Sequence, residues 1–172
     1  TMPAMKTVLR IQLNPTPEQG ERLRALQTGF SQVCNALAPV VQQTRIWNRV
    51  ALHHLAYRSL RQRFPAMGSQ MVCNAIYAVS RSCRLVFQSP QSPFNLERLG
   101  DRPLPLIQFH ERAPVFFDRH TLSLKDGSLS MFTPGGRAHF DVTLQSDEFI
   151  AHKLREAVLV SRDADAFDLV FH

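Results

Sequence analysis

Acidic residues are absent from a long central stretch of this chain, and lysine is scarce throughout it. No aspartate or glutamate occurs between Glu21 and Glu97, although the whole chain contains 14 acidic residues. Only three of the 20 basic residues are lysines, and the other 17 are arginines. A merely solvated surface normally mixes both signs of charge, because like charges repel one another in a compact protein. The missing carboxylates therefore indicate a partner for these arginines outside the chain.

Long apolar runs and paired cysteines are also missing. No apolar run approaches the roughly 18 residues of a membrane span, and the first residues contain no apolar core of a signal peptide. We therefore expect a cytoplasmic protein without a membrane partner. The three cysteines, Cys34, Cys73 and Cys83, form no CxxC pair. Buried free thiols are the expected state, and a metal or redox site is the alternative.

No established catalytic motif is present either. The chain contains no HExxH, no spaced Cys/His pairs, no GxSxG, no P-loop and no GxGxxG. Asp118 lies close to His120 in the sequence, as His139 does to Asp141, but turn and adjacent-strand positions predict surface groups. We predict no catalytic residue, no metal site and no cofactor. A small enzyme that uses Asp118 and His120 is the least favoured alternative.

The acid-free stretch carries nine arginines without a counter-charge. They are Arg22, Arg24, Arg45, Arg49, Arg58, Arg61, Arg63, Arg81 and Arg84. Nucleic-acid phosphate is the leading candidate for their partner, because a guanidinium fork binds phosphate in a bidentate manner. An acidic protein partner is the alternative.

The N-terminal part of the chain predicts a strand followed by an amphipathic helix. Residues 6–13 alternate well enough for a strand. Thr16 and Gln19 then form the capping box of a helix. Apolar residues over 23–37 recur at three-, four- and seven-residue intervals, which is typical of one buried helix face. Pro39 is expected to end or kink this helix.

Two further helices are predicted, over 48–64 and from Ser69 to about Gln88. In the earlier one the inward positions are Leu52, Leu55, Ala56 and Leu60, and the outer face carries Arg49, His53, Tyr57, Arg61 and their neighbours. The later one has one polar stripe, formed by Gln70, Asn74, Tyr77, Arg81, Arg84 and Gln88. Amides, a phenol and guanidinium groups can bind base edges and phosphates together. A plain solvent-exposed face is the alternative interpretation.

After a proline-rich linker over 89–105, the sequence predicts a series of short antiparallel strands. The expected strands are 106–109, 115–117, 121–124, 129–132, 138–142, 155–161 and 167–171. Lys125-Asp126-Gly127 predicts a tight turn between two of them, and the N-terminal strand can pair into the set. We therefore predict an α+β fold, a small antiparallel β-barrel with an inserted three-helix lobe. The expected division is 1–14 for the first barrel strand, 15–96 for the helical lobe and 97–172 for the remaining strands.

Four stretches occur in a characteristic order: KTVLRIQLNPTPEQGERL, then SQMVCNAIYAVSRSCRLVF, then RAPVFFDRHTLSLKDGSLSMFTPGGRAHF, and last residues 159–171. In order and spacing they resemble the transposon-encoded TnpB proteins. These are RNA-guided nucleases of insertion sequences and are ancestral to type V CRISPR effectors. The resemblance covers nearly all of residues 5–172.

The resemblance implies a wedge barrel of first and late strands with a recognition lobe inserted between them. In that family both lobes hold the guide RNA scaffold and read a short motif that flanks the target in duplex DNA. The arginine stripe is then expected to lie along RNA or DNA backbone. The predicted nucleic-acid-binding residues are Gln70, Asn74, Tyr77, Arg81 and Arg84 on the later helix, and Arg49, His54, Tyr57, Arg58 and Arg61 on the earlier one.

The family's RuvC-like nuclease domain and zinc ribbon would follow His172, where this sequence ends. We therefore predict a nucleoid-associated RNA- and DNA-binding module that is not an enzyme on its own. The expected partners are guide-type structured RNA, duplex DNA flanking a target, and a separate nuclease subunit. The alternative is a basic protein-interaction subunit that docks a separate partner such as a nuclease.

Overall fold

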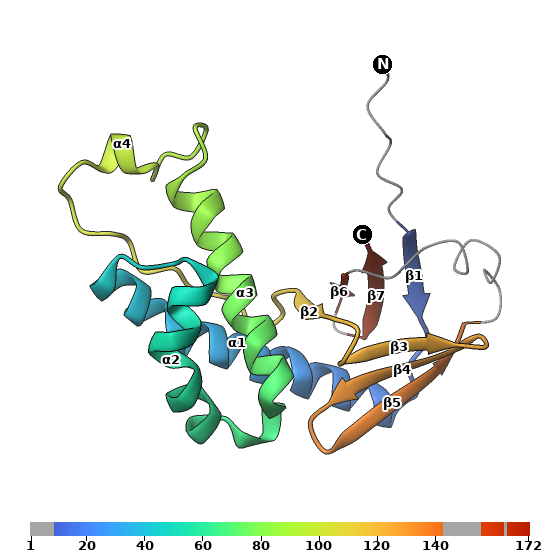
Figure 1. The fold of residues 1–172 in the computed structure, drawn as a ribbon. Helices are drawn as coiled ribbons and strands as arrows, with labels where there is room; N and C mark the ends of the chain where they lie inside the picture. Colours follow the sequence, from blue (N-terminus) through green and yellow to red (C-terminus); the bar gives the residue numbers. More distant parts are fainter. Residues whose placement is uncertain (1–8, 143–155, 164) are drawn as a thin grey trace. The chain divides into compact units, whose positions relative to one another are not determined.

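The computed structural model describes residues 9–142, 156–163 and 165–172 (Figure 1). Two predicted strands extend beyond these ranges, because residues 6–8 and residue 155 lie outside the described part of the chain.

The chain divides into two compact units. One unit consists of Thr1–Gln27 and Arg112–His172, and the other of Thr28–Glu111. We call them the β unit and the helical unit, because all described strands belong to the former and most helical residues to the latter. The unit boundaries differ from the predicted ones: the start of the first helix belongs to the β unit, and the proline-rich segment after Glu97 belongs to the helical unit.

The β unit contains two antiparallel sheets. Its strands are β1 (Leu9–Leu13), β2 (Val115–Phe117), β3 (Leu122–Lys125), β4 (Ser128–Thr133), β5 (Gly136–Asp141), β6 (Ala157–Asp163) and β7 (Ala166–Phe171). One sheet has the order β1-β7-β6-β2 and the other the order β3-β4-β5. The predicted α+β class is therefore confirmed. The described strands form two separate sheets and no closed barrel.

Local sequence accounts for the hairpin between β3 and β4. Lys125 pairs with Ser128, so the loop consists of Asp126 and Gly127 alone. Both loop residues have positive φ, 51° and 76°, as a two-residue turn that matches the strand twist requires. The predicted tight turn is confirmed.

The first and last strands of the chain pair with each other. Ile11 lies opposite Leu169 in the β1–β7 ladder, so the predicted pairing of the N-terminal strand into the late strands is confirmed. Next to this pair, the carboxylate of Asp168 is buried. It accepts a hydrogen bond from Arg162 Nε at 2.7 Å and lies 3.5 Å from Arg10 Nε. Two guanidinium groups thus compensate one buried charge.

The predicted strand over 106–109 is wrong, because this segment bonds to a helix side chain and joins no sheet. Asn35 Nδ2 donates to the carbonyl oxygen of Phe109 at 2.9 Å, and its Oδ1 accepts from the amide of Phe109 at 2.7 Å. The Asn35 amide therefore provides the two hydrogen bonds that a neighbouring strand would provide.

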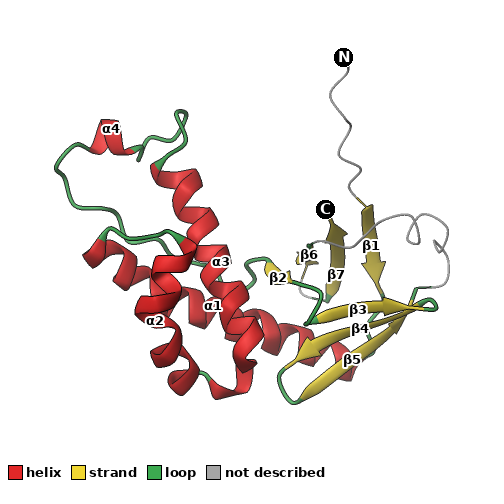
Figure 2. Cartoon of the chain, viewed as in Figure 1, coloured by secondary structure: helices red, strands yellow, loops and turns green. Residues whose placement is uncertain are grey.

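The helices are α1 (Pro17–Thr44), α2 (Arg49–Arg63), α3 (Gly68–Phe87) and the short α4 (Leu96–Leu99), with a 3-10 turn η1 (Pro65–Met67) between α2 and α3 (Figure 2). The predicted capping box opens α1: Thr16 N donates to Gln19 Oε1 at 3.0 Å, and Gln19 N donates to Thr16 Oγ1 at 3.2 Å. The expected end at Pro39 is wrong, since α1 continues to Thr44. Burial of Leu37 and Val41 on either side of the proline stabilises the continued helix.

Helix α2 begins and ends as predicted, but one of its expected core positions is wrong. Leu52, Ala56 and Leu60 are buried and follow each other at four-residue intervals. Leu55 is 51% exposed, because it lies about 100° around the helix from Ala56. None of the described helices is both long enough and apolar enough to cross a membrane.

The cysteines are free thiols. Cys34 and Cys83 are buried and Cys73 is half-buried. Burial raises the pKa of Cys83 to about 12 and also raises the pKa of Cys34 above its ordinary value. Because the thiolate is the reactive form, neither of these two cysteines is a ready nucleophile or metal ligand.

Candidate nucleic-acid interface

The net charge of the chain belongs entirely to the helical unit. Residues 28–111 contain nine arginines and three carboxylates, whereas the β unit contains 11 basic and 11 acidic residues. The whole formal net charge of +6 therefore lies on the helical unit. A field of one sign on one unit raises the local concentration of polyanions and increases their association rate.

Two of the nine arginines in the acid-free stretch do have carboxylate partners. Arg22 lies 3.5 Å from Glu18, and Arg24 lies 3.0 Å from Asp165. Both pairs belong to the β unit, and both acids come from outside the acid-free stretch. The prediction that all nine arginines lack a counter-charge is therefore wrong for these two, because sequence distance does not reveal pairs made by the fold.

The other seven arginines belong to the helical unit. No ion pair with a described carboxylate is formed by Arg45, Arg49, Arg58, Arg61, Arg63 or Arg84. Two of these six lie apart from the predicted site. Arg45 Nη1 donates to the carbonyl oxygen of Arg102 at 3.5 Å, and the guanidinium carbon of Arg63 lies 5.3 Å from the ring centroid of Phe64.

The remaining arginines lie on the packed pair of helices α2 and α3 (Figure 2). We use the name α2–α3 basic surface for Arg49, His54, Tyr57, Arg58 and Arg61 on α2 together with Tyr77, Arg81 and Arg84 on α3. Within it, the side chains of Arg49, His54, Arg58 and Arg84 are exposed, and the other four are half-buried.

Aromatic contacts order the middle of this surface. The guanidinium carbon of Arg49 lies 5.7 Å from the ring centroid of Tyr77, so the fold brings together two predicted residues from different helices. The rings of His53 and Tyr57 stack with centroids 4.5 Å apart and planes 14° apart. Cation–π and stacking contacts of this kind restrict side-chain rotation. His53 was not among the predicted binding residues, although its four-residue spacing from Arg49 and Tyr57 is the signal that identifies it.

The amide residues of the predicted stripe are not exposed as expected. Asn74 is only 8% exposed, and its Nδ2 lies 3.6 Å from Met71 Sδ. Gln70 is half-buried. The contact of Tyr77 with Arg49 shows that this part of the stripe faces α2 and not solvent. The expectation that Asn74 presents its amide to base edges is therefore wrong, because the packing of α2 against α3 covers it.

Arg61 has an unusual environment for a guanidinium group. Its side chain is half-buried, and its Nη1 is buried without a hydrogen-bond partner among the described residues. Leaving a buried donor unsatisfied costs about 1–3 kcal/mol. An oxygen of a bound anion would remove this cost.

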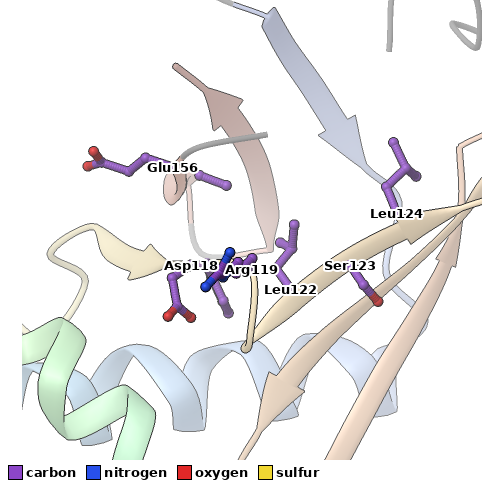
Figure 3. A pocket seen from close by; sticks show the side chains of 8 residues that line it. Asp118, Arg119, Leu122, Ser123, Leu124 and Glu156 are labelled. Atoms are coloured by element: carbon purple, nitrogen blue, oxygen red, sulfur yellow. The ribbon is translucent and has the colours of Figure 1, made fainter. Parts of the chain in front are cut away.

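A small cavity of about 230 Å³ lies in the β unit (Figure 3). The labelled carboxylates of Asp118 and Glu156 point in different directions there, so they do not form an acid pair. Asp118 Oδ1 accepts hydrogen bonds from the amide and the hydroxyl of Thr121, at 3.1 and 2.8 Å. Asp118 thus stabilises a turn, and His120 beside it is exposed. Among the described residues, no group of three or more His, Cys, Asp or Glu side chains is placed to hold a metal ion.

Comparisons with known proteins do not assign this chain. No protein-family model matches it, and no curated protein matches it either. The resemblance to TnpB proteins stays a prediction that rests on four stretches of the sequence.

Proposed function

We propose that the helical unit binds structured nucleic acid through the α2–α3 basic surface. The observation that carries this proposal is the combination of nine arginines with only three carboxylates in one unit, and the lack of described ion pairs for Arg49, Arg58, Arg61 and Arg84. Guanidinium groups bind phosphate through charge-assisted, bidentate hydrogen bonds. Cations held on rigid helices lose less side-chain entropy when they bind than cations on mobile loops.

Within this proposal, the chain acts as the guide-RNA- and target-flank-binding half of a TnpB-like RNA-guided DNA effector. The two sheets correspond to the wedge barrel of that family, and the helical unit corresponds to its recognition lobe. The chain itself does not cut DNA, and a separate nuclease subunit supplies the cleavage. Its ligands are guide-type structured RNA and the duplex DNA beside the target.

The direct test is to purify the protein from its own host and to sequence the RNA that remains bound. The expected result is one enriched RNA species with extensive base pairing. Recovery of only the most abundant cellular RNAs, in proportion to their abundance, would contradict a guide-binding role.

A second function is favoured by a separate observation on the same helices. Val50 and Leu55 on α2 and Leu85 on α3 are 62%, 51% and 61% exposed. Exposed aliphatic side chains next to arginines are typical of surfaces that bind proteins. The helical unit would then dock an acidic protein, for example a nuclease subunit. Purified protein that carries no nucleic acid and elutes with a protein partner would favour this second function.

A further inference from the structure

We infer that the α2–α3 basic surface binds the phosphate backbone alone and does not read bases. This inference rests on the proposed nucleic-acid binding and specifies its mode. Proteins read bases in two ways: polar side chains form hydrogen bonds to base edges, or aromatic side chains stack on unpaired bases. The groups that each way requires are covered by other parts of the helical unit.

The amides that would read base edges are withdrawn between the helices. Asn74 is 8% exposed beside Met71, and Gln70 is half-buried and already has an interaction partner. Gln88 is the exposed amide of the stripe, but it lies at the C-terminal cap of α3. Since one amide side chain pairs with one base, Gln88 cannot specify a sequence motif.

The aromatic rings of α2, α3 and the α1–α2 connection already have neighbours in the protein. The Tyr57 ring is stacked by His53 at 4.5 Å, and the Tyr77 ring is covered by Arg49. The rings of Trp47 and Phe87 have centroids 5.1 Å apart. Trp47, Tyr57 and Tyr77 are all half-buried. Single-strand binding by stacking needs open rings on which successive bases can lie, and this surface does not offer such a series.

Exposed cationic groups remain available on both helices. Arg49 and Arg58 on α2 and Arg84 on α3 are exposed, and none of them pairs with a described carboxylate. Contacts of arginine with phosphate position a protein on a nucleic acid without carrying sequence information. The ligand class is therefore a chain of regularly spaced phosphates, whatever its bases. Sequence selection would then come from another component, such as a paired guide strand.

The test compares probes that share a backbone and differ in bases. The full chain is titrated, by fluorescence anisotropy at one salt concentration, against two oligonucleotides of equal length and scrambled sequence. A third probe of that length is an abasic deoxyribose-phosphate chain. The expected Kd values agree within about threefold, which is less than 1 kcal/mol. A loss of more than about tenfold for the abasic chain, or between the two sequences, would overturn the inference, because one base contact alone provides that discrimination.

Variants separate this inference from the proposed function. The double variant R58Q/R84Q should weaken binding of intact and abasic probes by the same factor. Its control is Arg63→Gln, which removes an exposed charge from α2 outside the basic surface and should change binding by less than the double variant. Weakening of the intact probes alone would overturn the inference and leave nucleic-acid binding in place. No binding of any probe would overturn the proposed function and, with it, this inference.

Discussion

Asn74 and Arg84 belong to the same polar stripe of α3, but their side chains have different surroundings. Asn74 is buried where α3 packs against α2, whereas Arg84 is exposed near the end of the helix. A buried amide contributes to folding through its hydrogen bonds, while an exposed guanidinium group costs little to hold and is free to bind a ligand. Burial therefore separates structural residues from binding residues within one stripe.

The first prediction concerns Asn74. Asn74→Ala should lower the free energy of unfolding by about 1–3 kcal/mol, because it removes a buried polar group and its contacts. It should leave the sequence preference of nucleic-acid binding unchanged. Urea unfolding measures the first quantity. The matched control is Gln88→Ala on the same stripe, where an exposed side chain predicts a change within about 0.5 kcal/mol; equal effects of both substitutions would refute the assigned burial.

The second prediction concerns the buried carboxylate of the β unit. Asp168→Ala should destabilise the protein by about 1–3 kcal/mol, because Arg10 and Arg162 lose their shared buried partner. Both arginines are partly exposed, so water partly replaces the carboxylate. Thermal unfolding of Asp165→Ala is the comparison: its pair with Arg24 is exposed and contributes at most about 1 kcal/mol. A larger loss for Asp165 than for Asp168 would contradict this ranking.

At the scale of elements, local signals identified several features of the fold. The Thr16–Gln19 capping box and the Asp126-Gly127 turn are set by neighbouring residues, and both form as the sequence indicates. Features that depend on distant residues could not be predicted. Asn35 binds the backbone of Phe109 across 74 positions of sequence, and no pattern in either segment indicates this.

The same distinction holds for the candidate site. Helical spacing correctly placed Arg49, Tyr57 and Arg61 on one flank of α2, because that arrangement follows from the helix repeat alone. The stripe on α3 was also recognised, but its amide part faces α2. Which side of a polar stripe a neighbouring helix covers depends on tertiary packing, so Asn74 was assigned to solvent incorrectly.

The third prediction concerns Pro39 in the interior of α1. Proline there removes one backbone hydrogen bond and crowds the preceding turn. Pro39→Ala should therefore stabilise the protein, by about 1–3 kcal/mol given the propensity difference between the two residues. Chemical denaturation followed by circular dichroism measures this change. A destabilised Pro39→Ala protein would mean that α1 needs the bend that proline introduces.

At the scale of the whole molecule, charge and structure are divided in the same way. The β unit carries equal numbers of acidic and basic residues, and the helical unit carries the net charge of +6. Composition alone indicated an external polyanion, but two of its nine arginines pair with acids of the β unit. The prediction of a polyanion ligand now rests on a smaller group of arginines that lie together on α2 and α3.

The salt dependence of nucleic-acid binding tests this claim most directly. Five arginines that each neutralise one phosphate predict a slope of log Kd against log salt concentration of about 4 to 5 in magnitude for duplex DNA. Removing three of them in R49Q/R58Q/R84Q should reduce the slope by about 2.7, at about 0.9 per phosphate. A slope that stays the same in the triple variant would contradict phosphate binding by the α2–α3 basic surface.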